Sequence, residues 1–307
     1  MLALLSGSSP RCLRNAVHLP DVTIPEGYDL ELPGRGTTYV TDVPGPPGAP
    51  TVLLLHAVGC TGMLTWFPAA EALSKRYRVV VFDQRWHGRG IQSDRFSLYD
   101  CADDVAAVID ALELTDVIVA GYSMGSIIAQ RVWRQHPDKI CGLVLCATTD
   151  RFRNTLSETV FHQSMGLTMA ALRDLSRYAI VRRTARRAAR NAARALDVEP
   201  TDIHDWALEQ FRSTSPWAVG QAVAALGRHH SRPWLHSIDV PTAVVVTTKD
   251  HVLPTERQRA LALRIPATTI HEVAAGHAAC VLQSDVFVPG LLEAVNTTAA
   301  RARDRAA

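Results

Sequence analysis

The stretch Val117-Ile118-Val119-Ala120-Gly121-Tyr122-Ser123-Met124-Gly125 decides the fold of this 307-residue chain. Its first four residues are a continuous apolar run, which is typical of a strand buried on both faces. Gly121, Ser123 and Gly125 then give the G-x-S-x-G spacing of a tight strand-to-helix turn. The residues from Ser126 to His136 have the apolar spacing of a short helix. The sequence therefore predicts a serine hydroxyl exposed at the carboxyl end of a central strand.

A serine hydroxyl is a weak nucleophile, so this interpretation requires a base and an acid further along the chain. Asp250 follows an apolar run that begins at Pro241 and predicts a buried strand. His277 ends the loop after a last predicted strand, Thr268–Val273. We expect His277 to take the serine proton, while Asp250 holds the imidazole in the correct tautomer and stabilises the imidazolium.

Alternatives exist for each of these polar residues. Asp250 can instead be an ordinary turn carboxylate at a strand end, in which case Asp150, just past the strand Leu143–Cys146, is the reserve acid. His56 and His87 are interpreted as structural rather than as substrate contacts.

The order of serine, acid and histidine resembles that of the α/β-hydrolase superfamily. Val52–Gly59 is similar to that family's strand and oxyanion loop, although Ala57 stands where the family commonly has glycine. The resemblance implies that the backbone N–H groups of Val58 and Met124 bind the developing oxyanion.

A second stretch carries the same resemblance. Val79–Gly90 is similar to a strand followed by the family's Asp-x-Arg-Gly-His-Gly-x-Ser turn, with Trp86 and Gly90 as departures.

Alternation of strands and helices predicts an α/β protein with a doubly wound, mostly parallel sheet. We expect a hairpin over Tyr28–Val43, a turn at the proline-rich stretch Pro44–Pro50, and then alternating strands and helices. The expected helices are Phe67–Arg76, Asp100–Leu112, Ser126–His136 and Val286–Asn296. Residues 1–20 are expected to be poorly ordered, and Thr297–Ala307 to form a polar tail.

No convincing strand occurs between the strand that ends near Thr149 and the one that starts at Pro241. By the resemblance, residues 150–232 form a helical cap inserted into one catalytic domain, which comprises residues 1–149 and 233–307. Such a cap would exclude water and shape the pocket. Fewer than half of its aromatic side chains are assigned to the pocket, because aromatics at helical spacing more often pack; they are Phe152, Phe161, Tyr178, Trp206, Phe211 and Trp217, with Trp234 at the exit.

The segment Arg182–Arg194 has the pattern of a basic amphipathic helix, with arginines on one face and mainly alanines on the other. One interpretation is contact with an anionic membrane surface or with an acidic carrier. We favour a solvated outer face of the cap, because the apolar side lacks the bulky side chains of a membrane-inserting helix.

Composition limits the partners and cofactors. The net charge of +2 predicts no general affinity for nucleic acid. The six cysteines form no C-x-x-C pair or His/Cys cluster, so we expect neither a metal site nor a disulfide framework, and no cofactor; only Cys60 is expected to be reachable from the active site.

No apolar stretch is long enough to span a bilayer, and the chain start lacks a signal-peptide pattern, so a cytoplasmic location is expected.

Three classes of function remain open. The favoured one is a serine hydrolase that cleaves a small, hydrophobic carboxylic ester or lactone through an acyl-enzyme. The second uses the same triad for C–C bond hydrolysis or perhydrolase chemistry. The third is a binding or receptor module on a hydrolase scaffold, since fold alone does not fix function.

Overall fold

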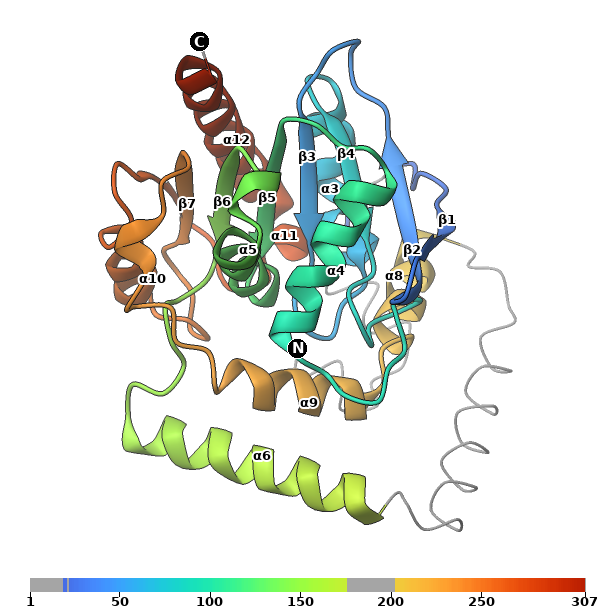
Figure 1. Ribbon diagram of the computed structural model, residues 1–307, viewed down its shortest axis with the longest axis vertical. Coiled ribbons are helices and arrows are strands. Elements are labelled where there is room, and N and C mark those ends of the chain that lie inside the picture. The colour runs from blue at the N-terminus through green and yellow to red at the C-terminus, as the bar shows by residue number, and fades with distance from the viewer. Residues whose placement is uncertain (1–18, 21, 176–201, 307) are drawn as a thin grey trace.

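The computed structural model describes residues 19, 20, 22–175 and 202–306 of the chain. Within these residues an eight-stranded sheet forms the centre of the molecule (Figure 1). Its strands are β1 (Tyr28–Leu32), β2 (Gly36–Val43), β3 (Thr51–Leu55), β4 (Arg78–Phe82), β5 (Val117–Tyr122), β6 (Gly142–Cys146), β7 (Thr242–Thr247) and β8 (Thr269–Val273).

The strand order is β1-β2-β4-β3-β5-β6-β7-β8. The β1–β2 hairpin is antiparallel and joins β4 in antiparallel fashion, whereas every pairing from β4 to β8 is parallel. The doubly wound, mostly parallel sheet predicted from the sequence is therefore confirmed. Because the parallel strands all end at one edge, the loops that follow β3, β4, β5 and β7 meet there.

Helices cover both faces of the sheet (Figure 1). Alternate residues of each central strand enter opposite cores, so that Leu53, Val119 and Leu145 face one layer while Val52, Ile118 and Val144 face the other. The first layer contains α4 (Leu98–Ala111), α5 (Met124–Gln135) and α10 (Thr255–Ala262). The second contains α3 (Gly62–Ser74), α11 (Ala279–Leu282) and α12 (Ser284–Ala306).

The insertion between β6 and β7 contains α6 (Leu156–Leu175), α8 (Ile203–Arg212) and α9 (Pro216–Leu226) in its described part. In Figure 1, α9 lies between α6 and the sheet. The insertion thus has the helical character predicted for a cap. Its boundaries at residues 150 and 232 remain a prediction, and the arginine-rich segment Arg182–Arg194 lies outside the described residues.

The two ends of this insertion are joined to each other. Arg151 and His230 form an antiparallel bridge, and the Ser231 N–H donates to the Asp150 carbonyl at 2.9 Å. Arg232 also donates to the buried Asp150 carboxylate at 2.9 Å. The chain therefore leaves the sheet and returns to it at one point.

Two helix limits differ from those expected by more than two residues. Helix α3 begins at Gly62, five residues before Phe67, because Thr61 accepts a hydrogen bond from the Leu64 N–H and caps the helix. The expectation of a polar tail over Thr297–Ala307 was wrong, because α12 continues to Ala306. Thr298 and Ala299 continue its buried face, and the Thr298 hydroxyl bonds back to the Ala294 carbonyl instead of to water.

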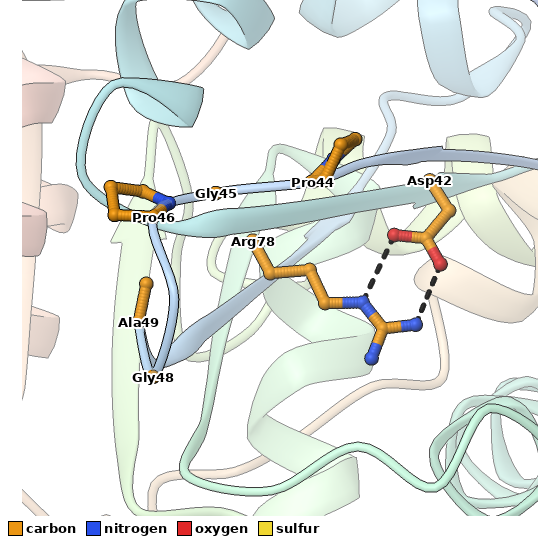
Figure 2. A pocket seen from close by; sticks show the side chains of 7 residues that line it. All are labelled: Asp42, Pro44, Gly45, Pro46, Gly48, Ala49 and Arg78. Atoms are coloured by element: carbon orange, nitrogen blue, oxygen red, sulfur yellow. Dashed lines mark hydrogen bonds and ion pairs between the residues drawn. The ribbon is translucent and has the colours of Figure 1, made fainter.

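The stretch Pro44–Pro50 forms the predicted turn between β2 and β3. It borders a surface hollow of about 400 Å³, in which Arg78 makes a two-pronged hydrogen-bonded ion pair with Asp42 (Figure 2). This hollow lies at the start of β3, whereas Ser123 follows the end of β5, which runs parallel beside β3. The hollow and Ser123 are therefore at opposite ends of the parallel strands.

The N-terminal segment expected to be poorly ordered lies outside the described residues, apart from 19 and 20. Among the helices that the structure describes, none is both long and apolar enough to cross a membrane.

Buried histidines make the fold sensitive to acid. Burial lowers the pKa of His56 well below its ordinary value, that of His87 to about 4 and that of His229 to about 3. In the unfolded chain each histidine takes up its proton near pH 6.5, so stability is present above that pH and is lost as the pH falls toward the folded pKa values. Each such pH unit costs up to about 1.4 kcal/mol per histidine.

We therefore expect the urea midpoint to fall between pH 6.5 and 4, with a shallower fall in His229→Leu, because both ring nitrogens of His229 are buried without a partner. Urea unfolding at several pH values measures this, with the exposed His236→Leu as the matched control. An equal slope in His229→Leu and wild type would show that His229 does not contribute.

Candidate active site

Ser123 lies on a strained turn between β5 and α5. Its φ of 52° and ψ of −109° are outside the regions that residues with a side chain favour. Two glycines make the turn fit: a Cβ on Gly121 would lie 2.3 Å from the Gly125 carbonyl carbon, and one on Gly125 would lie 2.0 Å from the Leu55 carbonyl oxygen. The Ser123 N–H donates to the Cys146 carbonyl of β6 at 2.9 Å, which fixes the turn from the other side. The backbone therefore holds the serine in one position at the carboxyl end of the central strand β5.

The structure brings together the three residues that the sequence nominated for catalysis. The Ser123 Oγ lies 3.1 Å from Nε2 of His277, and Nδ1 of His277 lies 2.7 Å from Oδ2 of Asp250. Each follows a different strand, β5, β8 or β7, so the parallel sheet supplies their proximity. The Tyr122 hydroxyl donates to the His277 carbonyl at 2.9 Å and steadies the histidine loop.

The Asp250 carboxylate is held by its own hydrogen-bond donors. Its Oδ1 accepts from the N–H groups of Val252 and Leu253, both at 2.8 Å. Its Oδ2 accepts from the Thr247 hydroxyl at 2.8 Å and from Gln258 Nε2 at 3.3 Å, besides His277. Burial alone would raise the pKa of Asp250, but these hydrogen bonds and the neighbouring His277 hold it below its ordinary value.

Sequence reasoning missed Thr247 and Gln258. Gln258 is fully buried on α10 and also accepts from the Thr247 N–H at 3.0 Å. A polar residue on a short helix after the acid strand gives no local signal of this contact, because the contact depends on how α10 folds back on β7.

Asp150, the reserve acid, is engaged elsewhere. Its carboxylate receives Arg232 at 2.9 Å and lies 3.6 Å from Arg264. It belongs to the junction of the insertion, and His277 makes its carboxylate contact with Asp250 instead.

The loop after β3 lies beside the serine turn because Leu55 pairs with Gly121. Among the described residues, the Val58 N–H donates to no partner. Met124 is the first residue of α5, so its N–H has no acceptor within the helix, and the helix dipole adds positive potential there. These are the N–H groups predicted for the oxyanion hole. Ala57, the departure from glycine, does not need a positive φ, and its N–H donates to the Thr65 hydroxyl at 3.3 Å.

The turn after β4 contains the other departures from the family pattern. Trp86 has a φ of 68°, a strained value for a residue with a side chain. Hydrogen bonds from its Nε1 to Ser93 at 3.1 Å and packing against Phe96 hold it there. At Gly88 a Cβ would lie 2.3 Å from the Asp83 carboxylate, which in turn accepts from the Gly62 and Arg89 N–H groups. Burial raises the pKa of Asp83 to about 6.

The described part of the insertion packs close to the loop after β3, which is predicted to contain an oxyanion donor. Thr61 donates to Gln210 of α8 at 2.8 Å, and a Cβ on Gly59 would lie 3.4 Å from Val219 of α9. Of the aromatic residues considered for the pocket, Trp206 packs edge-on against Phe67 and Trp234 stacks on Trp133.

Cys60 is partly buried next to the same loop, and burial raises the pKa of its thiol to about 11. Among the residues that the structure describes, no group of three or more His, Cys, Asp or Glu side chains is arranged to hold a metal ion. The expectation of a cofactor-free protein stays a prediction.

Comparison with known proteins gives the family. The chain matches the alpha/beta hydrolase fold family over residues 50–283 and belongs to it. Similar curated proteins include a pimeloyl-[acyl-carrier protein] methyl ester esterase from Chromobacterium violaceum, 28% identical over 81% of this chain and 96% of that protein. Others are 3-oxoadipate enol-lactonase 1 from Acinetobacter baylyi (23%; 83% and 91%) and a poly(3-hydroxyalkanoate) depolymerase from Ectopseudomonas oleovorans (26%; 81% and 86%).

Solved structures show the same fold. A hydrolase from Pseudomonas aeruginosa superposes with a TM-score of 0.69 at 21% identity, covering 89% of this chain and 99% of its own. An enol-lactonase from Burkholderia xenovorans gives a TM-score of 0.66 at 21% identity, with 88% and 100% covered.

The packing at the serine turn can be tested by adding one methyl group. Gly125→Ala should lower the free energy of unfolding by at least about 2 kcal/mol, because its Cβ would meet the β3 backbone. Gly166→Ala on α6 is the matched control: its Cβ meets nothing within 4 Å, so the change should stabilise the helix by up to about 1 kcal/mol. Urea unfolding measures both, and a Gly125→Ala protein as stable as wild type would contradict the close helix–strand contact.

Proposed function

We propose that this protein is a serine hydrolase that cleaves a small, hydrophobic carboxylic ester or lactone through an acyl-enzyme. One observation carries the proposal: the unbroken contact from the Ser123 hydroxyl through the His277 imidazole to the Asp250 carboxylate, at 3.1 and 2.7 Å. Those distances are within the reach required of a nucleophile, a base and an orienting acid.

Each residue then has a defined task. Nε2 of His277 takes the proton from Ser123 as Oγ attacks the substrate carbonyl carbon, and Asp250 stabilises the imidazolium that results. The N–H groups of Val58 and Met124 hydrogen-bond the carbonyl oxygen as it becomes negative. His277 returns the proton to the leaving alkoxide oxygen, which leaves the acyl group on Ser123. A water molecule, deprotonated by His277, then hydrolyses this acyl-enzyme and restores the serine.

The environment of the triad supports this chemistry. Asp250 stays ionised because its donors lower its pKa, so it can hold the Nδ1 proton of His277 at neutral pH. Met124 presents its N–H from a helix N-terminus, where partial positive charge favours a developing anion. The relatives whose names specify an ester or lactone substrate support the bond type. An intact Ser123–His277–Asp250 triad weighs against a binding module without catalytic activity. C–C bond hydrolysis and perhydrolase chemistry are less favoured alternatives to ester cleavage.

The nucleophile can be tested directly. Ser123→Ala should reduce hydrolysis of p-nitrophenyl esters by roughly 10⁴- to 10⁶-fold and abolish labelling by a fluorophosphonate, because no other group replaces Oγ. The exposed Ser164→Ala on α6 should retain activity and labelling. Activity within tenfold of wild type in Ser123→Ala would exclude Ser123 as the nucleophile.

The two candidate acids can be separated by matched amides. Asp250→Asn should lower kcat on the order of 10⁴-fold by favouring the wrong imidazole tautomer, with the fold retained. Asp150→Asn removes the charge beside Arg232 and Arg264, so it should lower stability and leave kcat within a few-fold of wild type. Steady-state kinetics and thermal unfolding of both variants decide, and a larger kcat loss in Asp150→Asn would reassign the acid.

A further inference from the structure

Gln84 and His56 lie beneath the oxyanion loop, outside the triad. His56 directly follows β3 and Gln84 lies two residues past β4, and the two strands are parallel neighbours with Leu54 beside Val81. Both side chains are buried, His56 completely and Gln84 to 1% exposure. Neither is used in the steps described above.

Hydrogen bonds link Gln84 to the loop through His56. The Gln84 backbone N–H donates to Nε2 of His56 at 2.8 Å, and the Gln84 side-chain Nε2 donates to the His56 carbonyl at 2.9 Å. Because Nε2 of His56 accepts, its Nδ1 carries the proton and donates to the Ala57 carbonyl at 2.8 Å. Gln84 therefore hydrogen-bonds the His56 ring through its backbone N–H and the His56 carbonyl through its side chain.

The remaining polar group of Ala57 is also fixed. Its N–H donates to the Thr65 hydroxyl, which donates in turn to the Thr61 carbonyl, both at 3.3 Å. Thus the His56 carbonyl and both backbone groups of Ala57 are engaged, and the next donor along the chain is the Val58 N–H, which has no partner among the described residues.

We propose that Gln84, acting through His56, is a positioning residue that holds the Val58 N–H in the direction required to bind the oxyanion. The inference rests on the proposed serine-hydrolase function. An oxyanion donor is effective only when it is aimed in advance at the place where charge develops, so a loop that can rotate loses transition-state binding without losing substrate binding.

Two features favour positioning over a purely structural role. The Gln84 side chain uses only its donor, since its Oε1 is buried without a partner, so an apolar side chain of the same length would fill the same space, remove that orphaned oxygen and withdraw only the donor to the His56 carbonyl. His56 also stays neutral at working pH, because burial and the nearby His87 lower its pKa, so the direction of its hydrogen bonds does not change with pH.

The test compares Gln84→Met and Gln84→Glu with Gln92→Met. Methionine keeps the length and volume but removes the donor to the His56 carbonyl, whereas glutamate keeps the shape and places an acceptor against that carbonyl. Gln92 is the matched control: it is exposed, and its amide donates to the Gly90 carbonyl at 3.0 Å. For each protein we would measure kcat and KM for a p-nitrophenyl ester, Tm, and the affinity for a trifluoromethyl ketone, which forms a tetrahedral adduct with the serine.

We expect kcat of Gln84→Met to fall about tenfold, short of the roughly 10²- to 10³-fold loss for removing a donor outright, with KM unchanged. Trifluoromethyl ketone affinity should fall by the same factor, because the adduct carries the oxyanion. The lost hydrogen bond and the removed orphan oxygen have opposite effects on stability, so Tm should stay within about 3 °C of wild type. Gln84→Glu should lose more activity, and Gln92→Met none.

The outcomes separate this inference from the proposed function. Wild-type kcat and ketone affinity in Gln84→Met, in a protein whose Ser123→Ala variant is inactive, would overturn the positioning role and leave the hydrolase proposal intact. A fall in Tm with kcat and KM unchanged would also overturn it, by showing a structural role. If wild type shows neither esterase activity nor ketone binding, or Ser123→Ala keeps its activity, the proposed function fails and this inference fails with it.

Discussion

The close contact between Gly125 and the Leu55 carbonyl is the constraint on which the rest of the site depends. It lets α5 start directly beside β3, so the serine turn and the loop after β3 share one small space. The strained φ of Ser123 and the need for glycine on both sides of the serine follow from this close approach. The strained turn raises the free energy of the folded state, and the buried pairing of β5 with β3 and β6 offsets this.

Parallel strands place the remaining groups with little help from local sequence. Asp250 and His277 are separated by 27 residues along the chain, yet both follow strands that end at the same edge. The donors around Asp250 and its partner His277 offset the effect of burial on the Asp250 pKa, whereas burial keeps His56 and His87 neutral. These groups thus differ in protonation because hydrogen-bond donors outweigh burial at the carboxylate, whereas burial outweighs the hydrogen bonds of the two imidazoles.

Much of this arrangement could be predicted because it depends on local patterns. Apolar runs marked the strands from β3 to β7, and the spacing of Gly121, Ser123 and Gly125 marked the turn. The residues that the sequence did not reveal act across the fold: Gln258 reaches Asp250 from α10, and Gln84 reaches the loop after β3 from the turn that follows β4. The end of α12 was missed for a related reason, since Thr298 satisfies its hydroxyl within the helix and so behaves as a core residue.

The junction at Asp150 and Ser231 has a consequence for how such a protein can change. Because Arg151 pairs with His230 where the chain departs and returns, the sheet meets the insertion as a single closed stem, whatever length of chain lies beyond it. Longer or shorter segments can be exchanged on this stem without altering the register of β6 and β7. Under the proposed function, a change in the chain above the stem can alter the substrate pocket while Ser123, Asp250 and His277 keep their places at the ends of β5, β7 and β8.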